Sequence, residues 1–134
     1  MKLYADEPGH LEIRALEGVV ISALARVEVP AALWRKARLG QLEETDAAVL
    51  VSEFEVDFHG ESGTAPRFTV AAVNEQVLVA AARESARHSL RAYDAVQLAS
   101  ALAVQAVDPR CSAFACFDAA LRKATARAGL ELVP

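Results

Sequence analysis

The chain has 134 residues, 54% of them hydrophobic, and a formal net charge of −4. That length fits a single domain over residues 1–134, and it is enough to bury a core without disulfide or metal cross-links. The apolar content excludes an intrinsically disordered chain. No apolar run approaches the ~20 residues that a membrane-spanning helix needs. We therefore expect a folded domain with no membrane segment.

The acidic charge gives the chain no overall basic field, which argues against tight nonspecific binding to nucleic acid. The acidic net charge is still compatible with an enzyme that holds RNA through a local basic rim and metal ions. The two cysteines, Cys111 and Cys116, lack the CxxC spacing of a zinc site, and Cys116 lies in an apolar stretch. Because the N-terminus also lacks the apolar region of a secretion signal, the sequence favours reduced cysteines and a cytoplasmic location.

The chain alternates short β-branched or aromatic runs with helical patterns. In its first half we expect the end of a helix at 2–4, a turn at 7–9, a helix over 10–17, a strand over 19–21, a helix over 23–39 and a helix over 45–57. A polar Gly-rich loop over 59–66 follows. In the second half we expect a strand over 68–70, helices over 74–87 and 90–106, a strand over 114–117, a helix over 119–128 and a last strand over 130–133. Strands separated by helices predict an α/β fold with a parallel sheet covered on both faces.

Asp94 stands where an acid is costly. In the predicted helix it shares a face with Leu90, Leu98 and Ala101. A carboxylate on an apolar face needs a cation or a metal beside it. One interpretation is a salt bridge, for example with Arg91. The other, which we favour, is a metal-binding or catalytic role.

Two further acids stand out. Glu28 interrupts an apolar helix face between Leu24 and Ala32, although a surface partner such as Arg35 would explain it equally well. Asp118 follows the run FACF and opens the next helix, where aspartate is an ordinary N-cap. It also stands at the carboxyl end of a strand, where ligands bind in open α/β sheets. These two roles are compatible.

Clustered carboxylates repel one another, and Mg²⁺ or Mn²⁺ is the natural ion between them. Such a site suits phosphodiester hydrolysis, because the metal activates water and neutralises charge on the phosphate. The sequence has no P-loop, GxGxxG, HExxH or GxSxG motif. His10, His59 and His88 show no ligand spacing, and we expect all three at the surface.

Four stretches together resemble a PIN-domain ribonuclease of the VapC toxin type: KLYADEPG, VVISALARVEVPAAL, ARHSLRAYDAVQLASAL and FACFDAALRKATARAGLELVP. They occur in the family's order and cover most of the chain, except residues 41–67. The resemblance implies a three-layer α/β/α fold, in which four acids line one Mg²⁺ or Mn²⁺ pocket that cleaves RNA. By resemblance, Glu28, Asp94 and Asp118 match the second, third and fourth acids. Arg91 is adjacent to Asp94 and could orient an acid or contact phosphate, and an ordinary surface arginine explains it equally well.

The chain departs from this family in two places. Cys116 stands where the family usually has Ser or Thr. The sequence also begins at what would be the end of the family's first helix, so the first strand and the first catalytic Asp have no counterpart. We expect a misplaced start, in which a GTG-encoded valine was read as the initiating Met1. An in-frame stop codon immediately upstream would contradict that expectation.

The resemblance thus implies a metal-dependent endoribonuclease, the toxin half of a toxin–antitoxin pair. RNA would be its substrate, an antitoxin protein would block its pocket, and it would form homodimers. The alternative from a different functional class is a non-catalytic PIN-like remnant that only binds a partner. A DNA-cleaving or repair nuclease of the same fold is a more distant alternative.

Overall fold

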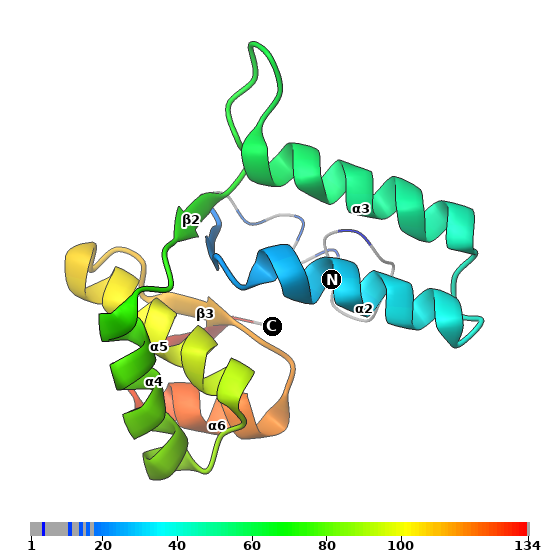
Figure 1. Ribbon diagram of the computed structural model, residues 1–134. Coiled ribbons are helices and arrows are strands. Elements are labelled where there is room, and N and C mark those ends of the chain that lie inside the picture. Colours follow the sequence, from blue (N-terminus) through cyan, green and yellow to red (C-terminus); the bar gives the residue numbers. More distant parts are fainter. Residues whose placement is uncertain (1–3, 5–10, 12–13, 15, 17, 134) are drawn as a thin grey trace. The chain divides into compact units, whose positions relative to one another are not determined.

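The computed structural model describes Tyr4, Leu11, Arg14, Leu16 and residues 18–133 (Figure 1). The chain divides into two compact units, an N-terminal unit (Met1–Val70) and a C-terminal unit (Ala71–Pro134). Each unit is described by itself, so a single domain over the whole chain stays a prediction. Among the residues described, no helix is long and apolar enough to cross a membrane.

The N-terminal unit contains strand β1 (Val20–Ser22) and helices α2 (Ala25–Arg38) and α3 (Glu44–His59). Strand β2 (Thr69–Ala71) begins in this unit and pairs with β1 in a two-stranded sheet. Leu11 and Arg14 are helical, in agreement with the helix predicted over 10–17. Helix α2 ends in a Schellman motif at Gly40, whose φ of +66° is a conformation that glycine adopts without strain.

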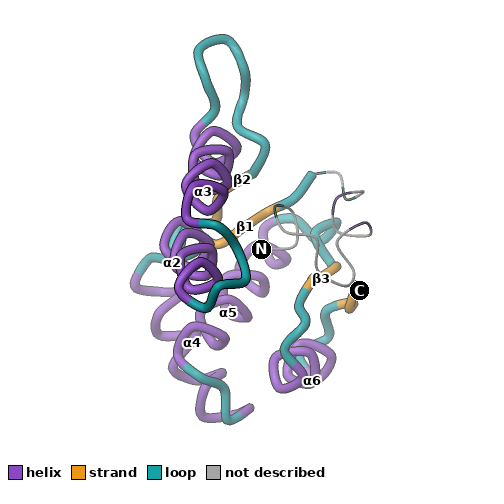
Figure 2. Tube along the Cα trace, turned by 90° about the vertical axis from the view of Figure 1, so that its right-hand side faces the viewer, coloured by secondary structure: helices purple, strands orange, loops and turns teal. Residues whose placement is uncertain are grey.

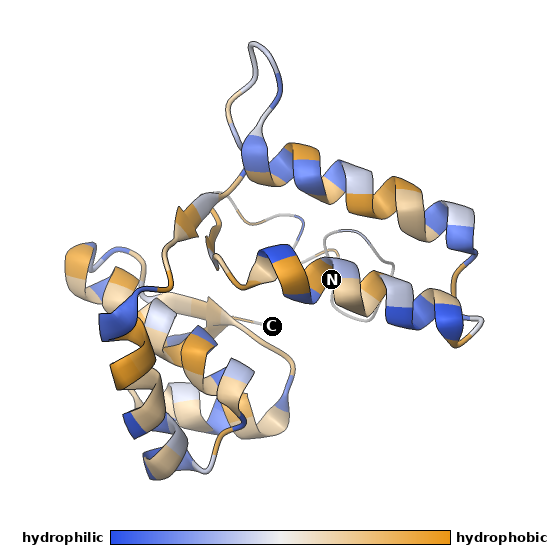
Figure 3. Ribbon diagram, viewed as in Figure 1, coloured by the Kyte–Doolittle hydropathy of each residue, from blue (hydrophilic) through white to orange (hydrophobic). Residues whose placement is uncertain are grey.

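Helices α2 and α3 pack side by side (Figure 1). Hydrophobic and hydrophilic residues alternate along both, as expected for helices with one apolar face (Figure 3). The fully buried side chains of this unit include Leu33 and Phe54. The Phe54 ring lies 5.8 Å from the ring of Tyr4, at 90°, and 6.4 Å from that of Phe68. This aromatic cluster holds α3 against the residue that precedes β2.

The C-terminal unit contains α4 (Glu75–His88), α5 (Ala92–Val107), β3 (Ala113–Ala115), α6 (Ala119–Arg127) and β4 (Glu131–Val133). Helix α4 begins at Asn74, whose side chain accepts a 3.0 Å hydrogen bond from the Val77 amide. Strands β3 and β4 are parallel, with Phe114 opposite Leu132, and α6 forms the connection between them (Figure 2). This β–α–β arrangement is the one that a parallel pair requires.

One apolar core joins the helices and strands of the C-terminal unit. It is contributed mainly by α4, α5 and α6, together with side chains at the strand ends. Its buried members are Val77, Ala81, Leu90, Ala95, Leu98, Ala99, Cys116, Leu121, Ala124 and Leu130. The core fixes α5 and α6 against each other, and these are the two helices that begin near Asp94 and Asp118.

The secondary structure follows the sequence closely, since every predicted strand and helix from residue 18 onward is present with its ends shifted by a few residues. The pairing differs from the prediction. In the described part of the chain the four strands form two separate two-stranded sheets, whereas we expected one sheet. Each strand has three residues and offers few backbone hydrogen bonds, so its partner is decided by the packing around it. The structure therefore supports a helix-rich α/β chain.

Candidate functional site

Asp94 lies in the first turn of α5, at the edge of the core of the C-terminal unit. Arg91 is the N-cap residue of that helix, and Asp94 is half-buried. Leu90 and Leu98, which share its predicted face, are 6% and 0% exposed. The prediction that Asp94 interrupts an apolar face is therefore confirmed.

Asp118 follows β3 and begins α6. Its Oδ1 accepts a 2.9 Å hydrogen bond from the Leu121 amide, so the N-cap predicted from the sequence is confirmed. The side chain is exposed. A carboxylate has about four lone-pair sites, so the cap bond leaves Asp118 able to bind a second group. Its position beyond the carboxyl end of a parallel strand is where ligands bind in α/β sheets.

The C-terminal unit brings Asp94 and Asp118 into electrostatic contact. Burial raises the pKa of Asp94 above its ordinary value, and the negative charge of Asp118 raises it further. The guanidinium of Arg91 acts in the opposite direction and lowers that pKa. Of the four predicted site residues, Arg91 and Asp118 thus both lie within electrostatic range of Asp94.

Two carboxylates that repel each other suit a hard divalent cation. Mg²⁺ is commonly bound through one or two carboxylates, with waters and substrate phosphates completing its shell. Asp94 and Asp118 fit that pattern, because the charge of Asp118 acts unfavourably on Asp94 and the guanidinium of Arg91 offsets it in part. Within the described residues, no three His, Cys, Asp or Glu side chains come together in a group that could hold a metal. The site seen here is therefore a pair of acids.

Glu28, the other predicted site residue, lies in the first turn of α2 and is half-buried. It belongs to the N-terminal unit, whereas Asp94 and Asp118 belong to the C-terminal unit. Because the units are described separately, the convergence of Glu28 on the other two acids stays a prediction.

Arg122 secures the segment that carries Asp118. Its Nη1 donates to the carbonyl oxygen of Cys116 at 2.8 Å and to that of Val133 at 3.3 Å. The guanidinium thereby links the segment that follows β3 to the end of β4. The segment after β3 is the one that carries Asp118 into α6. Sequence reasoning missed this residue, because an arginine one turn into a helix carries no signal of a long-range carbonyl partner.

Cys116 is a free, buried thiol, as predicted. Burial raises its pKa above the ordinary value, whereas Arg122 and the hydroxyl of Thr125 lower it. Cys116 belongs to the hydrophobic core, so it is placed as a small packing residue two positions before Asp118.

The prediction for the histidines is wrong in one case. The side chain of His88 is only 7% exposed, and its Nε2 lies 3.2 Å from Oε2 of Glu84. His59, 47% exposed, lies at the surface as expected, and His10 is outside the described residues. Helix α4 packs against α5, and the burial of a side chain by such tertiary packing is not encoded in the α4 sequence alone.

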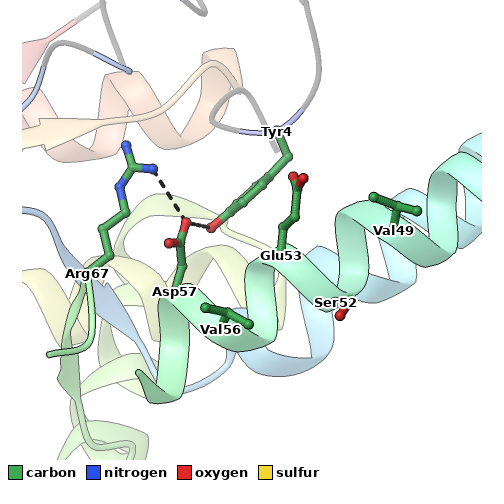
Figure 4. Close-up of a pocket in the computed structure, with 7 residues that line it drawn as sticks. All are labelled: Tyr4, Val49, Ser52, Glu53, Val56, Asp57 and Arg67. Atoms are coloured by element: carbon green, nitrogen blue, oxygen red, sulfur yellow. Dashed lines mark hydrogen bonds and ion pairs between the residues drawn. The ribbon is translucent and has the colours of Figure 1, made fainter. Parts of the chain in front are cut away.

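A second polar cluster, which sequence reasoning missed, lies in the N-terminal unit. The hydroxyl of Tyr4 donates a 2.6 Å hydrogen bond to Oδ2 of Asp57, and Nη1 of Arg67 lies 3.4 Å from the same oxygen (Figure 4). Burial and the bond to Asp57 raise the pKa of Tyr4 well above its usual range. These side chains line a shallow groove along α3 together with Glu53 and two valines. The 53-residue separation of Tyr4 and Asp57 left no local signal.

Comparison with known proteins adds no family assignment. No protein-family model matches the chain, and no curated protein gives a significant match.

Proposed function

We propose that this chain is a metal-dependent endoribonuclease, a VapC-like toxin with a PIN-like three-layer α/β/α fold. The observation that carries the proposal is the pair Asp94–Asp118, two mutually repelling carboxylates, of which Asp118 follows the carboxyl end of the parallel strand β3. The resemblance of the sequence around both acids supports the same conclusion. RNA is the substrate, and hydrolysis of a phosphodiester bond is the reaction.

Asp94 and Asp118, with Glu28, are the residues that would hold Mg²⁺ or Mn²⁺. When bound, such an ion lowers the pKa of a water molecule and offsets charge on the phosphate. Asp94 is the proton acceptor in this proposal, because it is half-buried and the nearby negative charge of Asp118 adds to burial in raising its pKa. Arg91 lies beside Asp94 and supplies a guanidinium that can hold a phosphate oxygen. Water attacks the phosphorus, the P–O bond to the leaving strand breaks, one proton of the water passes to Asp94, and the leaving oxygen takes a proton from solvent.

The biological setting belongs to the same proposal. The chain acts in the cytoplasm, forms homodimers and is inhibited by an antitoxin protein that covers the pair of acids. Size measurement of the purified chain checks the dimer. Co-purification with the product of an adjacent gene checks the antitoxin.

The decisive experiment measures cleavage of RNA by the full chain with Mg²⁺ or Mn²⁺, and after chelation by EDTA. We expect cleavage that needs the metal and is lost in Asp94→Asn. The matched control is Glu75→Gln, which changes an exposed acid in the first turn of α4 in the same unit. Equal cleavage by the wild type and Asp94→Asn, or cleavage that persists in EDTA, contradicts the proposal. Single-stranded DNA in place of RNA tests the alternative of a DNA-cleaving nuclease.

A non-catalytic binding role is the second candidate. The observation in its favour is that the described residues bring together two acids and no group of three metal ligands. This candidate predicts binding of the partner protein with no cleavage under any metal condition.

A further inference from the structure

The side chain of Arg122 joins two parts of the C-terminal unit that lie apart in the sequence. Arg122 is half-buried and lies near the start of α6. Its Nη1 donates hydrogen bonds to the carbonyl oxygens of Cys116, at 2.8 Å, and of Val133, at 3.3 Å. A terminal guanidinium nitrogen carries two hydrogens, so this one nitrogen can serve both carbonyls.

These two carbonyl groups lie where the pairing of β3 with β4 ends. The last pair of the register is Ala115 opposite Val133, so the carbonyl of Cys116 is one residue past the paired part of β3. Strands of three residues offer few backbone bonds to hold the segment that follows. A hydrogen bond from a charged donor is stronger than one between neutral groups. Arg122 therefore provides a strong donor at the point where the backbone ladder stops.

Asp118 is held from both sides along the chain. After it, its Oδ1 accepts a hydrogen bond from the Leu121 amide, and its carbonyl oxygen accepts one from the Arg122 amide, both at 2.9 Å. Before it, the Arg122 guanidinium holds the carbonyl of Cys116, two residues earlier. Because the backbone is fixed on either side of Asp118, the direction in which its carboxylate leaves the chain is restricted.

We propose that Arg122 is a positioning residue for Asp118, acting through the backbone carbonyls of Cys116 and Val133. This inference rests on the proposed function and deepens it, because the last strand then controls a metal site to which it contributes none of the proposed ligands. Loss of a group that orients a metal ligand typically costs about 10–100-fold in metal affinity or activity. Arg122 itself binds neither the ion nor the RNA.

The test compares two variants of the full chain. Arg122→Met removes the donors and keeps a long side chain, whereas Lys123→Met removes one positive charge from an exposed neighbour on the same helix. Binding of Mn²⁺ is measured by electron paramagnetic resonance of the free ion. We expect Arg122→Met to weaken this binding about 10-fold, and Lys123→Met to leave it unchanged. Arg122→Lys keeps a charged donor of different shape and should recover part of the loss.

A second readout needs neither metal nor RNA. Hydrogen exchange of the Leu121 amide reports its bond to the Asp118 carboxylate, and exchange of the Val77 amide reports the Asn74 cap of α4 in the same unit. We expect Arg122→Met to speed exchange at Leu121 and to leave exchange at Val77 unchanged. Equal acceleration at both amides would show a general loss of stability, and it overturns the positioning role.

Cleavage of RNA by the same chains separates this inference from the proposed function. Arg122→Met should raise the Mn²⁺ concentration for half-maximal cleavage about 10-fold, and excess Mn²⁺ should restore most of kcat. If no chain cleaves RNA but exchange at Leu121 alone is faster, Arg122 positions Asp118 and the ribonuclease proposal falls. If the wild type cleaves RNA and Arg122→Met has the same metal dependence, the positioning role falls and the proposed function stands.

Two further outcomes are decisive. If Arg122→Met and Lys123→Met weaken RNA binding equally and exchange at Leu121 is unchanged, Arg122 acts by charge attraction and the positioning role is overturned. Circular dichroism checks that each variant is folded. If Arg122→Met does not fold, Arg122→Lys is measured by the same two readouts. Faster exchange at Leu121 alone, with weaker Mn²⁺ binding, then supports the positioning role, and values equal to those of the wild type overturn it.

Discussion

The half-buried aspartates of the two units have opposite electrostatic surroundings. In the N-terminal unit Asp57 receives a hydrogen bond from Tyr4 and the charge of Arg67, both at the same oxygen. In the C-terminal unit the charge of another carboxylate, Asp118, acts on Asp94, and the guanidinium of Arg91 acts against that repulsion. A carboxylate with donors around it stabilises a fold. A carboxylate beside a second one lowers stability unless a cation binds there, and this difference separates a structural aspartate from a candidate catalytic one.

The largest expected effect is on cleavage. Asp94→Asn should reduce kcat for RNA by about 10²–10⁴-fold, the usual contribution of a positioned proton acceptor. Asp57→Asn should leave kcat within about threefold of the wild type, because Asp57 already has its partners. Initial rates at saturating RNA and fixed Mg²⁺ measure both. If the two variants lose activity equally, the distinction between the aspartates fails.

The next largest effect is on stability. Here we expect Asp57→Asn, and not Asp94→Asn, to be the damaging change. Asp57→Asn should cost about 1–2 kcal/mol of unfolding free energy, at the low end for charged hydrogen bonds because Arg67 is exposed to solvent. Tyr4→Phe should cost about 0.5–1.5 kcal/mol by removing the hydroxyl alone. Urea denaturation of the full chain measures these values. An Asp57→Asn chain as stable as the wild type would show that this cluster contributes nothing.

Asp118 has both a structural and a candidate catalytic role, since it caps α6 and its charge repels that of Asp94. Asp118→Ala should cost about 1 kcal/mol for the lost cap and should also abolish cleavage. Asp118→Ser keeps a capping oxygen, so it should retain stability and still lose cleavage. Asn74→Ala is the matched control: it removes the cap of α4, costs a similar ~1 kcal/mol, and leaves cleavage intact. A fully active Asp118→Ser chain would reduce Asp118 to a helix cap.

The smallest effect is a pH dependence of stability. Because the pKa of Asp94 is raised in the folded chain, the folded state holds this proton more tightly than the unfolded state does. Asp94 therefore lowers stability once the pH exceeds its ordinary pKa, and the cost is fully present above the raised value. In metal-free buffer we expect Asp94→Asn to be more stable than the wild type at pH 7, with the difference shrinking on acidification. Thermal melts from pH 3 to pH 7 measure this, and a constant difference would contradict it.

Much of the fold was readable from the sequence because the signals are local. Asp118 caps its helix through the amide of Leu121, three residues later, as its position after FACF predicted. The apolar face around Asp94 repeats at helical spacing. Each signal depends on atoms within a few residues, so no tertiary information is needed to read it.

The long-range contacts, which the sequence pattern left open, were decided by the tertiary structure. It paired β3 with β4, buried His88, joined Tyr4 to Asp57 and brought Asp94 within reach of the charge of Asp118. The sequence by itself determined where helices and strands begin and which acids stand on apolar faces. Only packing determined which of those acids meet, because such contacts join residues far apart in the chain and no local spacing encodes them.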